Sequence, residues 1–535
     1  MALDMTPEQR EIGKANFDRA VNEMANPPHR PGMSRRSFMK GMLAAGAAVP
    51  LTAAAYFGYT RLHGRPVRAA LIGAGDEGGI LVGESNPDFI EFVACCDIRP
   101  SNKKRIYDGE PPAAGPGGLW RKGFKRLYGN NAERSLRWYD NYKDLLENPD
   151  IEMVVIALPL HLHAPVSMDC MRAGKHVLCE KLMARTVSQC KEMVKVSKQT
   201  DKLLAIGHQR HYSLLYAQAV ELINSGVLGE VRHIRALWHR NQLPGRDSWR
   251  KTPPQEDVDA INALGAAKLK ELGYDSPREL FNWRTYRRTG GGLMAELGSH
   301  QLDACSIFLG KVHPVAVSGT GLKCYYDDDR EIEDHVLCTF EFPGKGYSDK
   351  PPRDKGTGLP NFNKTVAVTY SSVTTNAFEN YGECVMGTQG TLVVQQESEA
   401  MLYPPSAAGR STSVTVTTSA AGAPALDSWG SGPAPGAASS AAPRPAGATT
   451  YSRGYREEME HMAYCIRMRN QGMERDREDL KPRCHGLVAM GDAIIALGAN
   501  EAFHSQKREE FKESWFTESE DQQALPTWET LSKIS

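Results

Sequence analysis

Residues 67–78 read VRAALIGAGDEG, an apolar run that breaks into Gly73, Gly75 and Gly78. This spacing lets a strand turn tightly, lets the backbone approach a pyrophosphate, and opens a helix whose N-terminus attracts negative charge. A second apolar run, EFVACCD, ends at Asp97, which lies 19 residues beyond Gly78. A carboxylate at that distance accepts hydrogen bonds from the ribose diol of an adenosine. The two patterns predict a dinucleotide site, and the alternative is an ordinary glycine turn with a solvated aspartate.

The charges near this predicted site favour NAD over NADP. The carboxylate of Asp97 would repel the 2′-phosphate that distinguishes NADP from NAD. Arg99 follows two residues later and could accommodate that phosphate, so NADP stays a second possibility.

Strand and helix patterns alternate from about residue 67 to residue 207, which predicts an α/β domain with a parallel doubly wound sheet of the Rossmann type. The run IEMVVIALP is apolar throughout, as expected for a strand buried on both faces. Ligands of such sheets lie beyond the carboxyl ends of the strands. We therefore expect Pro159, Glu180 and Lys181, each just past a strand, beside the cofactor.

The sequence pattern changes downstream, where the segments VRHIRALWH, DHVLCTFEF and KTVAVTY favour strands and no regular helical segments separate them. They predict a C-terminal α+β domain with a largely antiparallel, open-faced sheet. We predict a leader over residues 1–65 and a nucleotide-binding domain over residues 66–207. A second domain is expected over residues 208–503, with a flexible Ala/Ser/Pro/Gly-rich insertion at about 404–450, and a tail over residues 504–535.

Residues 34–40 read SRRSFMK and precede an Ala-rich apolar segment, a pattern that predicts a twin-arginine export signal. Ala53, Ala54 and Ala55 offer a cleavage site. The apolar segment is also about long enough to span a bilayer when it is not cleaved. We expect a periplasmic protein, soluble or tethered to the membrane, that uses the twin-arginine translocation machinery. The alternative is a basic N-terminal helix.

Export and dinucleotide binding together constrain the cofactor. Twin-arginine export moves folded proteins, and an exported enzyme has little free NAD with which to exchange. We therefore expect a tightly bound cofactor that the enzyme's own reaction restores.

The composition indicates a soluble globular chain, because the formal net charge is zero and 24% of residues are charged. This balance gives no basic excess of the kind that binds nucleic acid. Most of the eleven cysteines lie in apolar runs and are expected to be buried and unpaired. No Cys-x-x-Cys pair or His/Cys cluster has zinc spacing, so we predict no metal.

The segments GAGDEGG, LPLHLHAP, GKHVLCEK and GGGLMAELGSHQLD, in this order and spacing, resemble the Gfo/Idh/MocA family, named after glucose-fructose oxidoreductase and inositol dehydrogenase. The resemblance covers residues 66–400 and 450–503. In that family a Glu-Lys-Pro motif supplies a lysine near the nicotinamide and the substrate. Here the motif reads Glu180, Lys181 and Leu182, so the lysine is retained and the proline is replaced.

The resemblance also implies catalytic groups on a helix of the second domain. Family members commonly carry an aspartate four residues before a histidine, and this chain has Glu296 and His300 there. The spacing puts Glu296, His300 and Asp303 on one helical face. We expect His300 to accept the hydroxyl proton, Lys181 to stabilise the developing alkoxide, and Glu296 to orient the imidazole. Asp303 is expected to be structural.

Further residues are expected around the cofactor and the substrate. His163 aligns with a family histidine near the nicotinamide, or it only begins a helix. Arg210 matches an arginine beside the active-site mouth in relatives. Trp283 and Arg284 lie in an insert at residues 241–290, where an aromatic face and a guanidinium suit sugar rings and their hydroxyls.

These observations favour an NAD-dependent oxidoreductase that acts on a secondary carbinol carbon of a sugar or sugar derivative. Two alternatives are a redox-neutral, NAD-dependent glycoside-cleaving enzyme and a non-catalytic nucleotide or sugar sensor. By family analogy we expect a homo-oligomer, a dimer or a tetramer, assembled through the open face of the second sheet.

Overall fold

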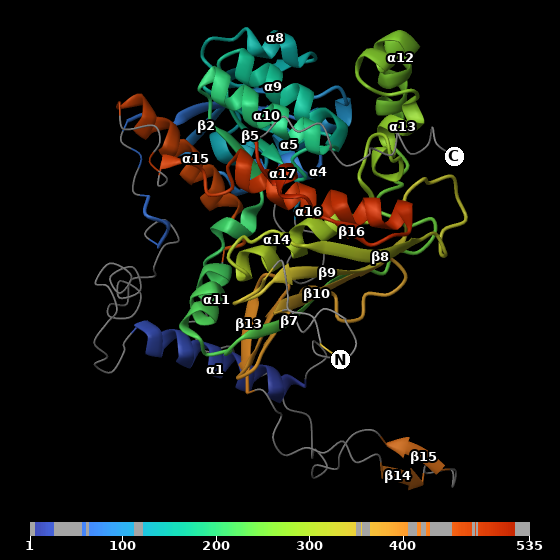
Figure 1. Cartoon of the computed structure of the whole chain (residues 1–535). Helices are drawn as coiled ribbons and strands as arrows, with labels where there is room; N and C mark the ends of the chain where they lie inside the picture. Colours follow the sequence, from blue (N-terminus) through green and yellow to red (C-terminus); the bar gives the residue numbers. More distant parts are fainter. Residues whose placement is uncertain are drawn as a thin grey trace.

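Two large sheets organise the part of the chain that the computed structural model describes (Figure 1). The described residues are 6–25, 56–59, 62, 64–111, 121–348, 355, 364–404, 415–418, 424–427, 452–472, 477 and 480–518.

The first sheet has six parallel strands in the order β3-β2-β1-β4-β5-β6. This is the doubly wound order, and it confirms the predicted Rossmann-type fold. The central strand β4 is buried at every residue, as its continuous apolar run predicts. The strands are β1 (Val67–Ile72), β2 (Ile90–Cys96), β3 (Arg137–Tyr139), β4 (Met153–Ile156), β5 (His176–Glu180) and β6 (Leu204–Gly207).

Helices follow these strands and begin where the sequence provides start signals. Pro100 occupies the first turn of α5, and the Thr186 hydroxyl accepts a hydrogen bond from Gln189 N at the start of α10. The elements of this domain are α4 (Asp76–Glu84), α5 (Pro100–Asp108), α6 (Phe124–Tyr128), α7 (Ala132–Ser135), α8 (Tyr142–Leu146), η1 (Leu160–Leu162), α9 (His163–Arg172) and α10 (Val187–Thr200).

The second sheet has the order β13-β12-β11-β7-β10-β9-β8-β16. Only the β7/β10 pair is parallel among its described strands, so the prediction of a largely antiparallel sheet is confirmed. Side chains of β10 alternate between buried and partly exposed, as one covered face requires. The strands are β7 (Val231–His239), β8 (Ala316–Leu322), β9 (His335–Pro343), β10 (Thr365–Val373), β11 (Tyr381–Gly387), β12 (Thr391–Gln395), β13 (Glu399–Tyr403) and β16 (Glu509–Glu510).

The C-terminal helices tie the two domains together. Helix α15 packs on strands of the first sheet, whereas α16 lies between α10 and the second domain's β8 and α14 (Figure 1). The remaining elements are η2 (Gln209–Tyr212), α11 (Leu214–Ser225), α12 (Gln255–Glu271), α13 (Pro277–Phe281), η3 (Trp283–Thr285), the π-helical η4 (Met294–Gly298), α14 (Ser299–Phe308), α15 (Tyr455–Asn470), α16 (Gly486–Ser505) and α17 (Glu513–Phe516).

Part of the predicted leader folds onto the second domain. Helix α1 (Pro7–Ala25) contacts β13 and α11, its Phe17 is buried, and the Asn16 amide donates to the Leu402 carbonyl at 3.1 Å (Figure 1). The twin-arginine motif and Ala53–Ala55 lie outside the described residues.

The predicted flexible insertion contains two short described strands, β14 (Thr415–Thr418) and β15 (Pro424–Asp427), which pair antiparallel. Among the described helices, α16 alone has the length and apolar composition of a membrane span. Most of α16 is buried inside the protein, which is typical of a core helix of a soluble domain.

Candidate active site

The glycine turn between β1 and α4 brings backbone segments into close contact. A Cβ at Gly73 would lie 2.3 Å from the Ala157 carbonyl oxygen, and one at Gly78 would lie 2.1 Å from that of Gly73. Gly73 also has a φ of 96°, which favours glycine. By contrast, a Cβ at Gly75 would meet no atom of the described residues within 4 Å. Two glycines therefore shape the turn, and the third faces open space at the helix start.

This open space fits a dinucleotide phosphate. In the described part of the chain no side chain caps the N-terminus of α4 at Gly75, so its first N–H groups are available to an anion. A small cavity adjoins Ala74 and Gly75 and is also lined by Arg105 and Arg121.

Asp97 lies at the end of β2, next to the glycine turn. Its Oδ2 accepts hydrogen bonds from Ala74 N at 2.8 Å and from the Asn102 amide at 3.0 Å, and its Oδ1 accepts one from Arg99 N at 2.8 Å. A carboxylate has about four acceptor positions, so one remains for a ligand hydroxyl. Burial raises the pKa of Asp97 despite these donors.

The guanidinium of Arg99 is paired within the protein. Its Nε and Nη2 lie 2.9 and 2.8 Å from Asp257 Oδ2, and Asp257 also accepts from the Ser101 hydroxyl at 2.6 Å. Asp257 belongs to α12 of the insert, so the ion pair spans the two domains. The sequence around Arg99 does not predict this ion pair, because Asp257 lies 158 residues away along the chain.

Lys181 follows β5 and reaches the second domain. Its Nζ donates a hydrogen bond to the Glu296 carbonyl oxygen at 3.0 Å, and the Lys181–Leu182 peptide bond is cis. The neighbouring Glu180 is buried, one of its oxygens has no partner among the described residues, and burial raises its pKa well above the ordinary value.

The expected pairing of Glu296 with His300 is wrong. The Glu296 carboxylate accepts a hydrogen bond from Arg284 Nε at 2.8 Å instead, while Nδ1 of His300 is buried without a partner among the described residues. Glu296 lies in the π-helical segment η4, whose wider turn departs from the α-helical spacing behind the prediction. Burial raises the pKa of Glu296, but the charges of Arg284 and Lys181 outweigh it and hold the pKa below its ordinary value.

His300 is held as a neutral imidazole. Burial lowers its pKa well below the ordinary value, and the positive charges of Lys181 and Arg210 lower it further. The Trp238 ring lies 5.5 Å from the His300 ring and stacks on Tyr381 at 4.4 Å. A neutral imidazole beside an aromatic pair can accept a proton from a hydroxyl of a ring-shaped ligand.

Arg210 lies in the interior and not at the mouth of the site, which corrects its predicted position. Two carboxylates bind its guanidinium: Nη1 lies 2.9 Å from Glu383 Oε1, while Nε and Nη2 lie 2.9 and 2.7 Å from Glu397 Oε1. Its Nη2 also donates a hydrogen bond to the Gln301 amide oxygen at 3.0 Å. It also donates to the His300 carbonyl. Arg210 therefore supports the backbone of the helix that carries His300.

His163 joins two strand-end loops. Its ring nitrogens lie 2.7 Å from the Leu182 carbonyl oxygen and 2.8 Å from the Leu158 carbonyl oxygen, and the residue is buried. Pro159 is the N-cap residue of η1 and lies three residues beyond the end of β4. The structure therefore gives His163 a role in holding the lysine loop.

Trp283 and Arg284 form one face of the site next to the Gly290–Gly292 loop. The Arg284 guanidinium lies 4.2 Å from the centre of the Trp283 ring. A Cβ at Gly290 would lie 3.1 Å from the carbonyl oxygens of both residues, so this glycine permits a close backbone approach. A larger cavity adjoins the same loop, but neither Lys181 nor His300 lines it.

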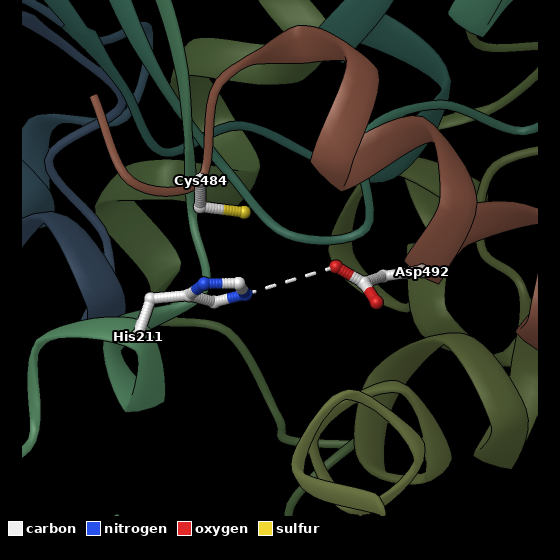
Figure 2. Close-up of side chains that lie close together, drawn as sticks. All are labelled: His211, Cys484 and Asp492. Carbon is white, nitrogen blue, oxygen red and sulfur yellow. Dashed lines mark ion pairs between the residues drawn. The ribbon is translucent and has the colours of Figure 1, made fainter. Parts of the chain in front are cut away.

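Asp303 belongs to a buried charge cluster apart from His300. It accepts hydrogen bonds from His211 Nε2 at 2.9 Å and from Lys311 Nζ at 3.0 Å. Figure 2 shows His211, Cys484 and Asp492 facing one another, close enough to hold a metal ion. The Lys311 ammonium, however, already bonds both oxygens of Asp492 at 2.7 and 2.9 Å.

The His211 ring faces both carboxylates of this cluster, with Nε2 2.9 Å from Asp303 and 3.8 Å from Asp492. Burial would lower the pKa of His211, but the Asp303 carboxylate outweighs it and raises the pKa well above the ordinary value. The direction of this shift favours an imidazolium that, with the Lys311 ammonium, balances the two carboxylates.

Comparisons with known proteins agree with this architecture. Residues 67–208 match the model of an oxidoreductase family with an NAD-binding Rossmann fold, and residues 260–393 match the GFO/IDH/MocA C-terminal domain. A glycosyl hydrolase family 109 protein of Stenotrophomonas maltophilia is 30% identical over 283 residues, which are 52% of this chain and 55% of that protein. The chain spans about half the length of the curated relatives it matches.

Solved structures share the fold at low sequence identity. An aldose-aldose oxidoreductase from Caulobacter crescentus, complexed with glycerol, is 19% identical with a TM-score of 0.52, over 84% of this chain and all of that chain. An inositol dehydrogenase homolog from Azotobacter vinelandii, complexed with NADH and myo-inositol, is 15% identical with a TM-score of 0.54, over 84% and 98%. The two matching models describe the nucleotide-binding domain and the C-terminal domain of one family, and together they cover just over half of the sequence. The chain belongs to the Gfo/Idh/MocA family of NAD-binding oxidoreductases.

Proposed function

We propose that this protein is an NAD-dependent oxidoreductase that acts on a secondary carbinol carbon of a sugar or sugar derivative. The observation that carries the proposal is the bond from Lys181 to the backbone of the segment that leads into His300. It brings an ammonium group from the nucleotide-binding domain to the helix that carries a neutral imidazole.

Each group has a separate task. Lys181 binds the substrate hydroxyl and stabilises the negative charge that develops on its oxygen. His300 accepts the hydroxyl proton, since its depressed pKa keeps it neutral. Arg284 and Glu296 neutralise each other and hold the helix segment in place, and Trp238 offers its face to a sugar ring.

The cofactor would be held by the glycine turn and by Asp97. The N-terminus of α4 at Gly75 suits the pyrophosphate, and Asp97 suits a ribose hydroxyl. Bound nicotinamide supplies the hydride acceptor or donor. We propose NAD over NADP because Asp257 neutralises Arg99, the residue that would otherwise attract a 2′-phosphate.

The insert would help to retain the cofactor, because it forms an ion pair on each side of the predicted adenosine site, and we call these two ion pairs the clasp. Asp257 pairs with Arg99 beyond β2, and Lys251 Nζ lies 3.0 Å from Asp76 at the start of α4. The predicted tight binding of the cofactor rests on these two bridges.

The clasp makes a specific prediction for Asp257→Asn. Because hydrogen bonds to charged groups contribute about 1.5–3 kcal/mol, we expect NAD to dissociate about tenfold faster than from the wild type. The measurement is the release of bound nucleotide into excess apo-dehydrogenase trap. Asp259→Asn removes an exposed carboxylate of the same helix and is the control, with no change expected. Equal release rates for Asp257→Asn and wild type would refute the clasp.

We also propose export through the twin-arginine machinery, supported by SRRSFMK and the apolar segment that follows. The double variant Arg35→Lys, Arg36→Lys is expected to remain in the cytoplasm, whereas the wild type reaches the periplasm or its membrane. Immunoblots of fractionated cells measure this, and an unchanged distribution would remove the export proposal. A dimer or tetramer stays a proposal by family analogy.

A second candidate is redox-neutral glycoside cleavage, favoured by the 30% identity to a glycosyl hydrolase family 109 protein. In that reaction, oxidation at one ring carbon would acidify the neighbouring C–H, and elimination, hydration and reduction would follow without net redox change.

One experiment separates these functions. The protein is isolated with its bound nucleotide, and the near-ultraviolet absorbance of the reduced nicotinamide is followed during a challenge with sugars, ketoses, lactones and aryl glycosides. Bleaching by a ketose or lactone supports the oxidoreductase. Release of the aglycone without net bleaching supports the glycosidase, and no response to any compound would leave a non-catalytic sensor.

A further inference from the structure

The guanidinium of Arg240 lies beside the proposed site, and no carboxylate among the described residues forms an ion pair with it. Arg240 follows β7 two residues beyond Trp238, and its N–H continues the ladder to the Val373 carbonyl at 2.9 Å. Strand alternation therefore turns Arg240 to the same face as Trp238, which contacts His300. The Arg240 guanidinium lies 4.7 Å from the centre of the Trp249 ring, and its Nε is buried without a hydrogen-bond partner among the described residues.

The two carboxylates whose charges act on Arg240 are paired with other arginines. Glu296 binds Arg284 at 2.8 Å, and Asp247 lies 3.0 Å from Arg330 Nη2. Burial accordingly lowers the pKa of Arg240, and those more distant carboxylates only partly offset it. A mostly desolvated guanidinium without a close counter-charge is costly to the protein alone.

We propose that Arg240 binds a carboxylate of the substrate, so that the substrate is a sugar acid and not a neutral sugar. This inference rests on the proposed oxidoreductase function and narrows its substrate class. The planar fork of a guanidinium matches a carboxylate through two parallel hydrogen bonds, and Trp249 holds the plane of the fork. The ligand would supply the charge that the described residues do not.

The test uses the full-length protein with its bound nucleotide. Quenching of the reduced nicotinamide fluorescence gives the dissociation constants of D-glucuronate and D-galacturonate, with D-glucose, D-galactose and D-glucose 6-phosphate as matched comparisons. We expect a uronate to bind the wild type at least about tenfold more tightly than its neutral sugar. Arg240→Gln is expected to weaken uronate binding by about tenfold to a hundredfold while leaving neutral sugars almost unchanged.

The controls separate charge from folding. Arg246→Gln removes an exposed arginine from the same segment and is expected to bind like the wild type. Arg240→Lys keeps the charge and is expected to recover part of the uronate affinity. If Arg240→Gln fails to fold, the wild-type preference and Arg240→Lys still decide the question.

Several outcomes would overturn the assignment of Arg240. They are equal wild-type affinities for uronates and neutral sugars, an equal loss for both classes in Arg240→Gln, and a preference for glucose 6-phosphate over every uronate. The oxidoreductase proposal fails separately, when neither class of compound changes the nicotinamide absorbance. Turnover of neutral sugars but not of uronates, seen as a change in nicotinamide absorbance, would therefore refute the carboxylate and keep the oxidoreductase function.

Discussion

Lys181→Ala is expected to lower kcat by about a hundredfold to a thousandfold, the usual loss when one preorganised donor to a developing oxyanion is removed. The Lys181 ammonium has a single described hydrogen bond, to the Glu296 carbonyl oxygen at 3.0 Å, so it can turn to a substrate hydroxyl at small structural cost. Turnover of a sugar or sugar acid under saturating substrate measures the effect, and the bound nucleotide is quantified in the same sample.

A matched variant controls for charge. Lys104→Ala removes an exposed lysine of α5 in the same domain and is expected to leave kcat unchanged. Lys181→Arg keeps a cation but changes its shape, and we expect it to recover only part of the rate. Full activity in Lys181→Ala with nucleotide still bound would exclude Lys181 from the chemistry.

The first domain could be predicted from the sequence because its signals are local. The apolar runs mark strands buried on both faces, and Gly73 and Gly78 lie where a Cβ would strike backbone atoms. The clash at Gly78 involves the Gly73 carbonyl oxygen of the same turn, whereas the clash at Gly73 involves Ala157 of the neighbouring strand's loop. The motif therefore predicts the turn, and the apolar runs predict the strands that surround it.

The electrostatic partners of the site residues could not be predicted in the same way. Arg210 is buried because Glu383 and Glu397 reach it from strands and turns more than 170 residues away. Glu296 meets Arg284, and not His300, because a π-helical segment replaces the assumed α-helical turn. The partner of each charge depends on the assembled sheet and on local helix geometry, which side-chain spacing alone does not specify.

The sequence predicts the position of Arg240 but not its missing counter-charge. Its position two residues beyond Trp238 marks a shared strand face, and that signal is present in the sequence. Its lack of a close carboxylate among the described residues emerges only after Glu296 and Asp247 are found with Arg284 and Arg330. An arginine without a close carboxylate among the described residues can thus be recognised only when the partners of all neighbouring charges are known.

His300→Ala is expected to lower kcat by about a hundredfold to ten thousandfold, because the variant lacks the group that accepts the hydroxyl proton. The loss should be partly rescued by added imidazole. His233→Ala is the control, since His233 lies on the opposite face of β7 from Trp238 and is expected to leave kcat unchanged.

The pH dependence tests the state of His300 directly. The base acts in its neutral form, and burial together with Lys181 and Arg210 lowers its pKa well below the ordinary value of about 6.5. Lowering that pKa moves the acid limb of the oxidation rate to lower pH, so kcat is expected to hold as the pH falls through about 6.5. A wild-type rate that halves near that pH, and loses this dependence in His300→Ala, would show that the imidazole titrates as it does in water. The proposed desolvated site, with an ammonium beside a neutral imidazole, would then be wrong.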